Sequence, residues 1–268
     1  MKNNLLTLSL LCFISLFSMT VYGQDAIYMG FKGGPNLASL VPGSSGKNQW
    51  NSDFSTIVGP KIGVFIEFEI TDNFSIQPEI VYSAEGSKRN GVQPLAIPGK
   101  YVRDFQETLH TDQDYVYSDV NNSYRFKYIN IPILAKLNLP LTPKFKFFVQ
   151  GGPYVGFLNR GKQKIKSEHF KAFLDKAQQE QIPPDIVEQY FGSSLDIEVE
   201  AKKKVRSGIK NFGLTGGIGF SYDLGLHKFF IEVNGNYGLS DIKNINQHGN
   251  QRLASMAVMI GYAYDVWD

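Results

Sequence analysis

The chain has 268 residues, which is long enough for one large domain or two domains of ordinary size. Aromatic residues make up 13% of it and glycine occurs 26 times, a composition that suits an all-β protein. Charged residues make up only 19%, and a formal net charge of +2 gives no case for nucleic-acid binding, which requires a clustered basic face. After the N-terminus, no apolar run approaches the roughly 18 to 20 residues that a membrane-spanning helix needs.

Residues 1–23 have the pattern of a secretory signal peptide. Lys2 supplies the positive charge, Leu5 to Met19 form an apolar core, and Val21-Tyr22-Gly23 is a small-residue cleavage site. A membrane anchor is the alternative, but the apolar core is too short for one. We therefore expect one mature domain, residues 24–268. The only cysteine, Cys12, lies inside the apolar core, so we expect neither disulfides nor thiol chemistry in that domain.

The mature chain alternates between apolar and small or polar residues, which is the period-two pattern of β-strands. The hairpin from Lys210 to Ser240 is a clear case: one parity is apolar and aromatic, and the other is glycine, polar or acidic. The remaining strands are predicted at Ala26 to Leu37, Ile57 to Ile70, Phe74 to Ser87, Arg125 to Asn138, Phe145 to Leu158 and Arg252 to Trp267. A soluble sandwich would turn the apolar parity toward a packed core, whereas a membrane barrel turns it toward lipid.

The lengths of the connections favour the membrane barrel. Short turns alternate with long connections. The long connections run from Leu37 to Thr56, from Lys88 to Tyr124, from Asn159 to Ile209 and from Asp241 to Gln251. Outer-membrane barrels show this asymmetry, with short periplasmic turns and long extracellular loops, whereas a soluble lipocalin-like barrel would have more uniform loops. We therefore predict an all-β fold, an eight-stranded antiparallel transmembrane β-barrel integral to the bacterial outer membrane.

Five stretches carry a resemblance to a known family. They are YMGFKGGPNLASL at Tyr28 to Leu40, IGVFIEFEITDNFSIQPEIVYS at Ile62 to Ser83, YINIPILAKL at Tyr128 to Leu137, FFVQGGPYVGFL at Phe147 to Leu158 and FFIEVNGNYGLSDI at Phe229 to Ile242. In this order they resemble the PorT-type outer-membrane β-barrel family of Gram-negative bacteria. The resemblance implies an eight-stranded barrel, and namesake members of the family assist a secretion machinery. The chain end departs from the pattern, because such barrels often finish on an aromatic residue and this one finishes Val266-Trp267-Asp268.

No motif predicts a catalytic, cofactor or metal site. Gly156 to Lys162 has the spacing of a phosphate-binding loop, but Gln163 stands where Ser or Thr would bind magnesium. Gly219 to Asp223 lacks the second glycine of a nucleophile elbow. The histidines fall in predicted loops or turns without paired metal spacing: His110, His169, His227 and His248. We predict a non-enzymatic barrel whose outer loops bind a partner; a barrel-embedded lipid-modifying enzyme or a small-solute conduit is the alternative.

The polar parity predicts a lumen that is closed to solutes. Eight strands leave an interior just wide enough for side chains to fill. The polar residues expected there are Lys61, Glu67, Glu79, Lys136, Lys146, Gln150, Asp223 and Glu232. We expect the opposite charges among them to pair, because isolated ions would lose hydration without compensation.

The connection from Asn159 to Ile209 is too long for a simple link and has a pattern of its own. Alternate residues are basic at its start and acidic at its end, which predicts a hairpin that continues above the membrane with opposite charges across it: Lys162, Lys164, Lys166, Asp196, Glu198 and Glu200. Between these ends we predict two short helices, the first capped by Ser167.

The apolar stripes of these helices have two interpretations. They cover each other and the barrel mouth, or they stay exposed as a docking surface for an envelope or secretion protein. Their residues are Phe170, Phe173, Leu174, Ile186, Val187, Tyr190 and Phe191. Nearer the membrane, we expect four cations to contact the phosphates of outer-membrane lipid, including lipopolysaccharide: Lys202, Lys203, Lys204 and Arg206.

Overall fold

The computed structural model describes residues 26–43, 46–167, 170–192, 195–201, 210–243 and 250–267. Its long strands are β1 (Ala26–Pro42), β2 (Ser55–Thr71), β3 (Phe74–Ala96), β4 (Tyr115–Pro140), β5 (Phe145–Ser167), β7 (Lys210–Leu224), β8 (His227–Gly238) and β10 (Asn250–Asp265). The shorter elements are β6 (Leu195–Ala201), β9 (Ile242–Lys243), η1 (Gly99–Tyr101), α2 (Val102–Leu109) and α3 (Pro184–Phe191). The predicted signal peptide, residues 1–23, lies outside the described residues.

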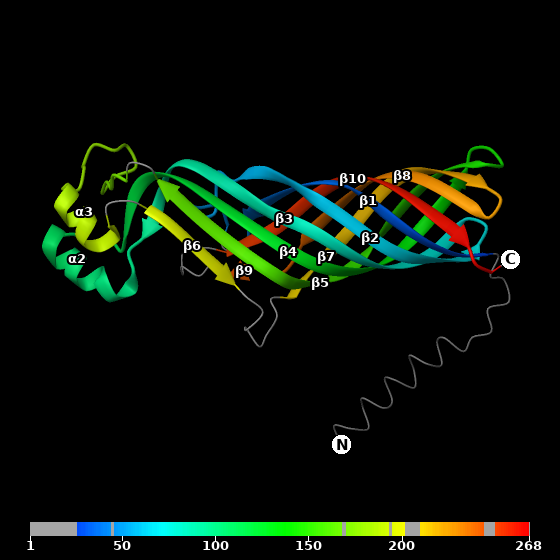
Figure 1. The fold of residues 1–268 in the computed structure, drawn as a ribbon, viewed down its shortest axis with the longest axis horizontal. Coiled ribbons are helices and arrows are strands. Elements are labelled where there is room, and N and C mark those ends of the chain that lie inside the picture. The colour runs from blue at the N-terminus through cyan, green and yellow to red at the C-terminus, as the bar shows by residue number, and fades with distance from the viewer. Residues whose placement is uncertain are drawn as a thin grey trace, which may run out of the picture.

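The eight long strands of the described chain close into a ring of antiparallel pairs. Their order is β1-β2-β3-β4-β5-β7-β8-β10, and β10 pairs back with β1. Closure gives the first and last strands a partner on both edges, as a sheet surrounded by lipid requires. Figure 1 shows the barrel lengthwise. The start of β1 and the end of β10 lie at one end, which we call the proximal end, and α2 and α3 lie at the opposite, distal end. The predicted eight-stranded fold is confirmed.

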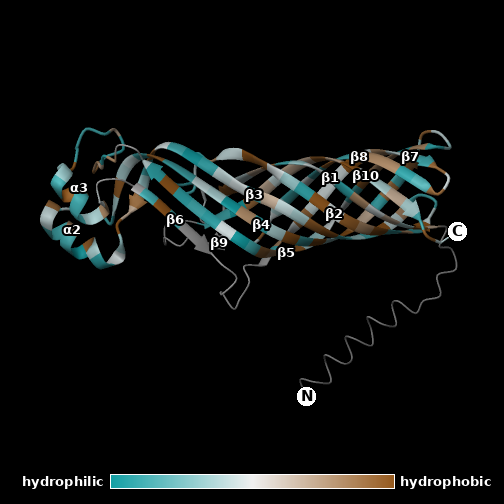
Figure 2. Cartoon of the chain, viewed as in Figure 1, coloured by the Kyte–Doolittle hydropathy of each residue, from teal (hydrophilic) through white to brown (hydrophobic). Residues whose placement is uncertain are grey.

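The outside of the ring is apolar and its inside is polar. On β8, for example, Phe229, Ile231 and Val233 are exposed, whereas Lys228 and Glu232 are buried. Apolar positions gather on the proximal half of the barrel, and hydrophilic ones take over on the distal parts of β3 to β5 (Figure 2). A soluble protein would bury the apolar parity, so the alternation matches a barrel that faces lipid over its proximal half.

Strands β3 and β4 continue together far past the other strands at the distal end. This corrects the sequence-based prediction of a loop from Lys88 to Tyr124, because the two strands stay paired from Lys88↔Ser123 to Ala96↔Tyr115. Pairing is made by backbone groups and does not require apolar side chains. Beyond the lipid-facing band polar side chains are solvated, so the alternation that marks a strand in the sequence is lost.

The distal part of β5 continues as a hairpin with β6, and this prediction is confirmed. The register places each lysine of β5 opposite an acidic residue of β6: Lys162↔Glu200, Lys164↔Glu198 and Lys166↔Asp196. The Lys162 ammonium lies 2.7 Å from the Glu198 carboxylate, diagonally across the pair. These side chains are more than a third exposed, so each pair contributes little to stability.

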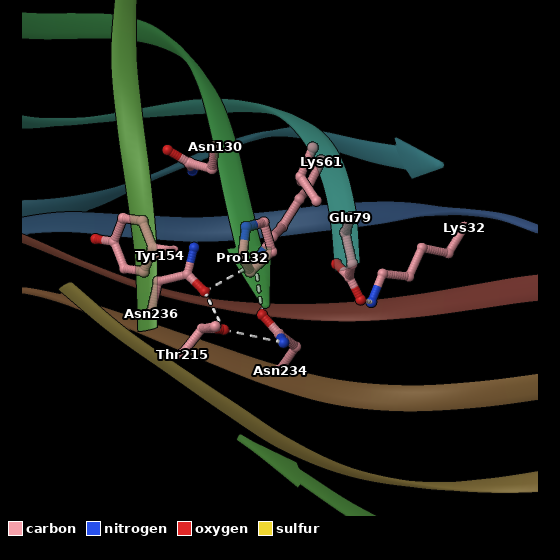
Figure 3. Close-up of a pocket in the computed structure, with 10 residues that line it drawn as sticks. Lys32, Lys61, Glu79, Asn130, Pro132, Tyr154, Thr215, Asn234 and Asn236 are labelled. Atoms are coloured by element: carbon pink, nitrogen blue, oxygen red, sulfur yellow. Dashed lines mark hydrogen bonds and ion pairs between the residues drawn. The ribbon is translucent and has the colours of Figure 1, made fainter. Parts of the chain in front are cut away.

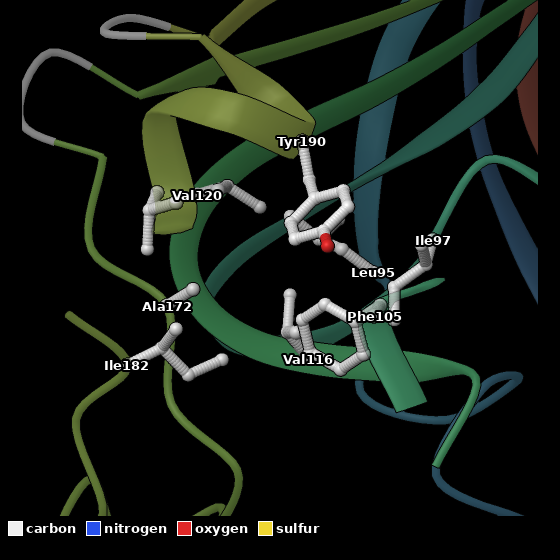
Figure 4. Packing of buried hydrophobic residues seen from close by; sticks show 9 residues of the cluster. Leu95, Ile97, Phe105, Val116, Val120, Ala172, Ile182 and Tyr190 are labelled. Carbon is white, nitrogen blue, oxygen red and sulfur yellow. The ribbon is translucent and has the colours of Figure 1, made fainter. Parts of the chain in front are cut away.

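The two helices and the ends of β3 and β4 share a hydrophobic core of their own, and we call this unit the distal cap (Figure 4). Its buried residues are Leu95, Ile97, Phe105, Val116, Val120, Ala172, Ile182, Val187 and Tyr190. Helix α3 forms where the second short helix is predicted. None of the described helices is long and apolar enough to cross a membrane.

The first predicted helix, beginning after Ser167, does not form over the described residues 170–177. Instead the backbone of Phe173 pairs with Tyr117 of β4 at 2.8 and 2.9 Å. The Asp175 carboxylate then accepts the backbone N–H groups of Gln179 and Glu180, which closes a turn. The apolar residues whose spacing suggests a helix belong instead to an extended segment that packs against the cap core.

Gly152 on β5 marks a close approach of β4 and β5. A Cβ added there would overlap the carbonyl oxygen of Ile133, whereas at the neighbouring Gly151 the nearest atom would be 3.6 Å away. We predict that Gly152→Ala lowers the free energy of unfolding by about 1–3 kcal/mol, because the overlap displaces backbone. Gly151→Ala is the matched control and should change it little. Urea unfolding followed by heat-shifted gel mobility measures both, and equal losses would contradict the argument.

Candidate functional site

The proximal part of the lumen is filled by a balanced cluster of charges. The Lys136 ammonium lies 2.9 Å from one oxygen of Glu67. The Lys228 ammonium lies 3.7 Å from the same oxygen and 2.9 Å from Glu69. All four side chains are less than a tenth exposed. Two ammonium groups and two carboxylates thus compensate each other where water is largely excluded.

A second cluster joins strands that are not neighbours in the ring. Lys32 of β1 places its ammonium 2.7 Å from Glu79 of β3 and 2.8 Å from Glu232 of β8. The other oxygen of Glu232 accepts a hydrogen bond from the Gln150 amide at 2.9 Å, and Gln77 donates to Glu79 at 2.6 Å. Because β1 pairs with β2 and β10, these ion pairs cross the lumen rather than run along its wall.

Aromatic rings inside the barrel pack against the same lysines. The rings of Phe65 and Phe148 each meet Phe230 edge to face, with centroids 5.6 and 6.3 Å apart. The Lys136 ammonium lies 4.4 Å from the centroid of Phe148, a distance at which a cation is attracted to the ring face. The aromatic residues therefore both fill the interior and help to compensate the buried charge.

Lys61 lies beside a small polar cavity (Figure 3). Its ammonium donates to the amide oxygens of Asn234 and Asn236, at 2.6 and 3.2 Å. Thr215 and Tyr154 line the same cavity. The cavity volume of about 10 Å³ has room for roughly one water molecule and no larger solute.

The structure buries six of the eight polar residues expected in the lumen: Lys61, Glu67, Glu79, Lys136, Gln150 and Glu232. The other two, Lys146 and Asp223, form a 3.0 Å ion pair near the proximal end of the barrel, and their side chains are 20% and 16% exposed. The sequence reasoning missed Lys32, Glu69 and Lys228. Lys32 and Glu69 lie on the inward parity of their strands, so the alternation of the sequence could have identified them. Lys228 directly follows the β7–β8 turn, where the alternation has only begun, so the sequence does not mark it as inward.

The seven residues considered as a docking surface form part of the distal cap. Phe173, Val187 and Tyr190 are buried. The other four are partly buried and pack against the cap core: Phe170, Leu174, Ile186 and Phe191. The interpretation as an exposed apolar docking surface is corrected, because these side chains cover one another and the ends of β3 and β4. The four expected lipid contacts, Lys202, Lys203, Lys204 and Arg206, lie outside the described residues.

The described part of the chain contains no group of three His, Cys, Asp or Glu residues that could hold a metal ion. His110 follows α2 in the distal cap. His227 opens β8 at the proximal end, where its ring nitrogen lies 2.8 Å from the Tyr262 hydroxyl. The two histidines thus lie at opposite ends of the molecule; His169 and His248 lie outside the described residues.

A closed antiparallel ring, an apolar outer band, charges that compensate each other in the lumen and long connections at one end together define an integral outer-membrane β-barrel. The family model for the outer membrane protein beta-barrel domain matches residues 22–244. The chain belongs to this family, and it is an integral protein of the outer membrane. The short turns place the proximal end in the periplasm and the distal cap outside the cell.

Several solved structures are similar to this chain. OprG from Pseudomonas aeruginosa is 10% identical, with 91% of this chain and 98% of that chain covered and a TM-score of 0.41. Neisserial surface protein A is 11% identical, with 89% and 97% covered and a TM-score of 0.39. The outer membrane protease OmpT from Escherichia coli is 8% identical, with 90% and 97% covered and a TM-score of 0.41. No curated protein matches the chain in sequence. The family assignment rests on the family model, and the fold on the strand pairing.

We predict that Lys136→Met lowers the free energy of unfolding by about 3–5 kcal/mol, because the more distant ammonium of Lys228 then becomes the one cationic partner of the fully buried Glu67 among the described residues. Lys146→Met is the matched control, since its partner Asp223 is partly solvated. The control should lose clearly less stability than Lys136→Met. Urea unfolding in lipid vesicles measures both variants, and similar losses would show that burial of the pair is irrelevant.

We also predict that the folded barrel does not conduct. Ion pairs cross the lumen at Lys32, and the cavity beside Lys61 admits about one water molecule. Planar-bilayer recordings of the purified protein should show no steady, large single-channel currents. Such currents from protein that is folded by gel mobility would overturn the closed-lumen interpretation.

Proposed function

We propose that this protein is a non-enzymatic barrel that holds the distal cap above the outer membrane, where the cap binds a partner. One observation carries the proposal: β3, β4 and β5 continue past the lipid-facing band and end in a unit with its own hydrophobic core. A barrel that served only as a membrane anchor or conduit would have no need of a folded unit at its distal end. The filled lumen argues against the conduit alternative.

The cap has the contacts of a fixed surface rather than of a mobile loop. The Tyr190 hydroxyl of α3 donates to the Asp104 carboxylate of α2 at 2.8 Å. The ring of Tyr190 also meets Tyr101 and Phe105 edge to face, with centroids 5.8 and 5.5 Å apart. These contacts fix the two helices relative to each other, so a partner would meet a preformed surface and would not have to order a flexible chain.

The outer surface of the cap is polar and charged. Arg103 and Glu107 are exposed on α2, and Asp185, Glu188 and Gln189 are exposed on α3. A surface of this kind favours an interaction steered by charge over one driven by a large apolar patch. The PorT-type resemblance suggests that the partner is a protein of the envelope or of a secretion machinery. An extracellular ligand is the alternative partner.

The test is affinity capture of the intact protein from native outer membranes, compared with a variant that lacks the cap. In that variant a short turn joins Ala96 to Tyr115 and residues 170–192 are deleted. This removes six of the nine buried cap-core residues and leaves Leu95, Val116 and Val120 on the paired ends of β3 and β4. The remaining barrel should therefore fold and keep its heat-shifted gel mobility. We predict that the partner captured by the intact protein is lost.

A matched pair of charge reversals refines this test. Arg103→Glu alters the cap surface, where the Arg103 side chain is 92% exposed and contributes little to stability. Lys47→Glu makes the same change in charge at an exposed side chain of the β1–β2 connection, outside the cap. Capture should weaken for the first variant and persist for the second. Undiminished capture by the capless barrel would refute the proposal.

A further inference from the structure

The outward faces of β4 and β5 carry a block of four cations just past the lipid-facing band. The register places Lys127 directly opposite Arg160, and Arg125 directly opposite Lys162. Lys127 and Arg125 are exposed, and their neighbours of opposite parity on β4 turn inward, as the buried Tyr128 shows. We call these four residues the basic block.

Like charges directly opposite each other destabilise a pair of strands. Lys162 is partly compensated by Glu198 of β6, whose carboxylate lies 2.7 Å from the ammonium. No described carboxylate forms an ion pair with Arg125 or Lys127, and neither side chain is buried. The β4 side of the block therefore carries two cations without an ion-pair partner among the described carboxylates, although an alternation of opposite signs, as on β5 and β6, would be more stable.

The basic block lies at the depth of lipid headgroups. Ile133 and Ile131 are exposed on the same face of β4, and Ile129 follows them on that parity. Lys127 is the next outward position, about 7 Å farther along the strand. On β5 the exposed Phe157 comes three positions before Arg160, with a shift in register between them. Since the headgroup region directly adjoins the hydrocarbon layer, phosphates of outer-leaflet lipid lie within reach of these side chains.

Other outward cations among the described residues, on β10 and on the distal part of β5, have acidic partners. On β10, Arg252 also points outward near the distal rim, but its guanidinium is bonded to Asp241 at 2.8 Å. Farther out on β5, Lys164 and Lys166 face acidic residues of β6. Arg125 and Lys127 differ from these cations because they adjoin the apolar band and form no ion pair with a described carboxylate.

We propose that Arg125 and Lys127, with Arg160 and Lys162 beside them, bind the phosphate group of a phosphorylated glycolipid in the outer leaflet, of the lipid A type. The guanidinium of Arg125 can hold two phosphate oxygens through its planar pair of N–H donors, and the lysines add point charge. The occupant is membrane lipid because the block borders the apolar band and faces sideways into the leaflet. This site is separate from the distal cap and does not depend on the partner proposed there.

The experiment uses the purified, folded protein in detergent micelles. Two probes with the same acyl chains are compared, lipid A with two phosphates and lipid A from which both phosphates have been removed. Native mass spectrometry measures the bound fraction of each. We expect the phosphorylated form to bind at least about tenfold more tightly, since each cation at the surface adds on the order of a fivefold gain. The preference should fall at an ionic strength of about 1 M, where charges are screened within about 3 Å.

The double variant R125Q/K127Q should lose most of this preference. The matched control K171Q/K176Q removes two exposed lysines of the distal segment, far from the lipid boundary, and should keep it. Gel mobility verifies the fold of each variant, and Lys127→Gln alone serves if the double variant does not fold. Equal binding of the two lipids, or an unchanged preference in R125Q/K127Q, would overturn the proposal. Equal competition by inorganic phosphate, or tighter binding of a soluble sulfated polysaccharide at the same residues, would also overturn it by assigning the block to another anion.

Discussion

An eight-stranded ring has too little interior space for both side chains and bulk water, and most of the structure follows from this constraint. Alternate residues of every strand must turn inward, so long polar side chains take the place that leucine would have in a soluble core. Because these groups are cut off from water, each charge needs a compensating group. Lys32 has two carboxylates, Glu67 has two ammonium groups, and Lys61 has two amide oxygens.

Outside the ring, the lipid requires that outward side chains be apolar, and this requirement ends at the edge of the lipid-facing band. As far as Ile129 and Phe157, the outward residues of β4 and β5 are apolar; beyond them they are charged or polar. Freed from lipid, these strands leave the ring, acquire β6 as a neighbour and carry the distal cap. The protein thus has two hydrophobic surfaces of different kinds, one facing hydrocarbon and one closed on itself around Phe105 and Tyr190.

The sequence predicted the parts of the fold that period-two alternation marks. It found the eight strands, the inward and outward parities and the hairpin in which Lys164 faces Glu198. It failed where a strand is solvated, as between Lys88 and Tyr124, because such a strand has no apolar face to reveal it. It also failed at Phe173, since pairing with Tyr117 is a contact between distant segments that local helical spacing cannot foresee. The ion-pair partners in the lumen depend on which strands face each other across the ring, so parity predicted the members of the network but not its connections.

The ion pairs of Lys32 also bear on how the barrel assembles. Lys32 and Glu232 are separated by 200 positions in the chain, and their strands become joined only through β10, the last strand. Until β10 pairs with β1, Lys32 and Glu232 lie toward opposite edges of an open sheet. Formation of the Lys32–Glu232 pair therefore requires the closing step, whereas Lys32 can meet Glu79 once β1, β2 and β3 are paired. Such closure brings together the most distant parts of the sequence, the kind of contact that forms slowly.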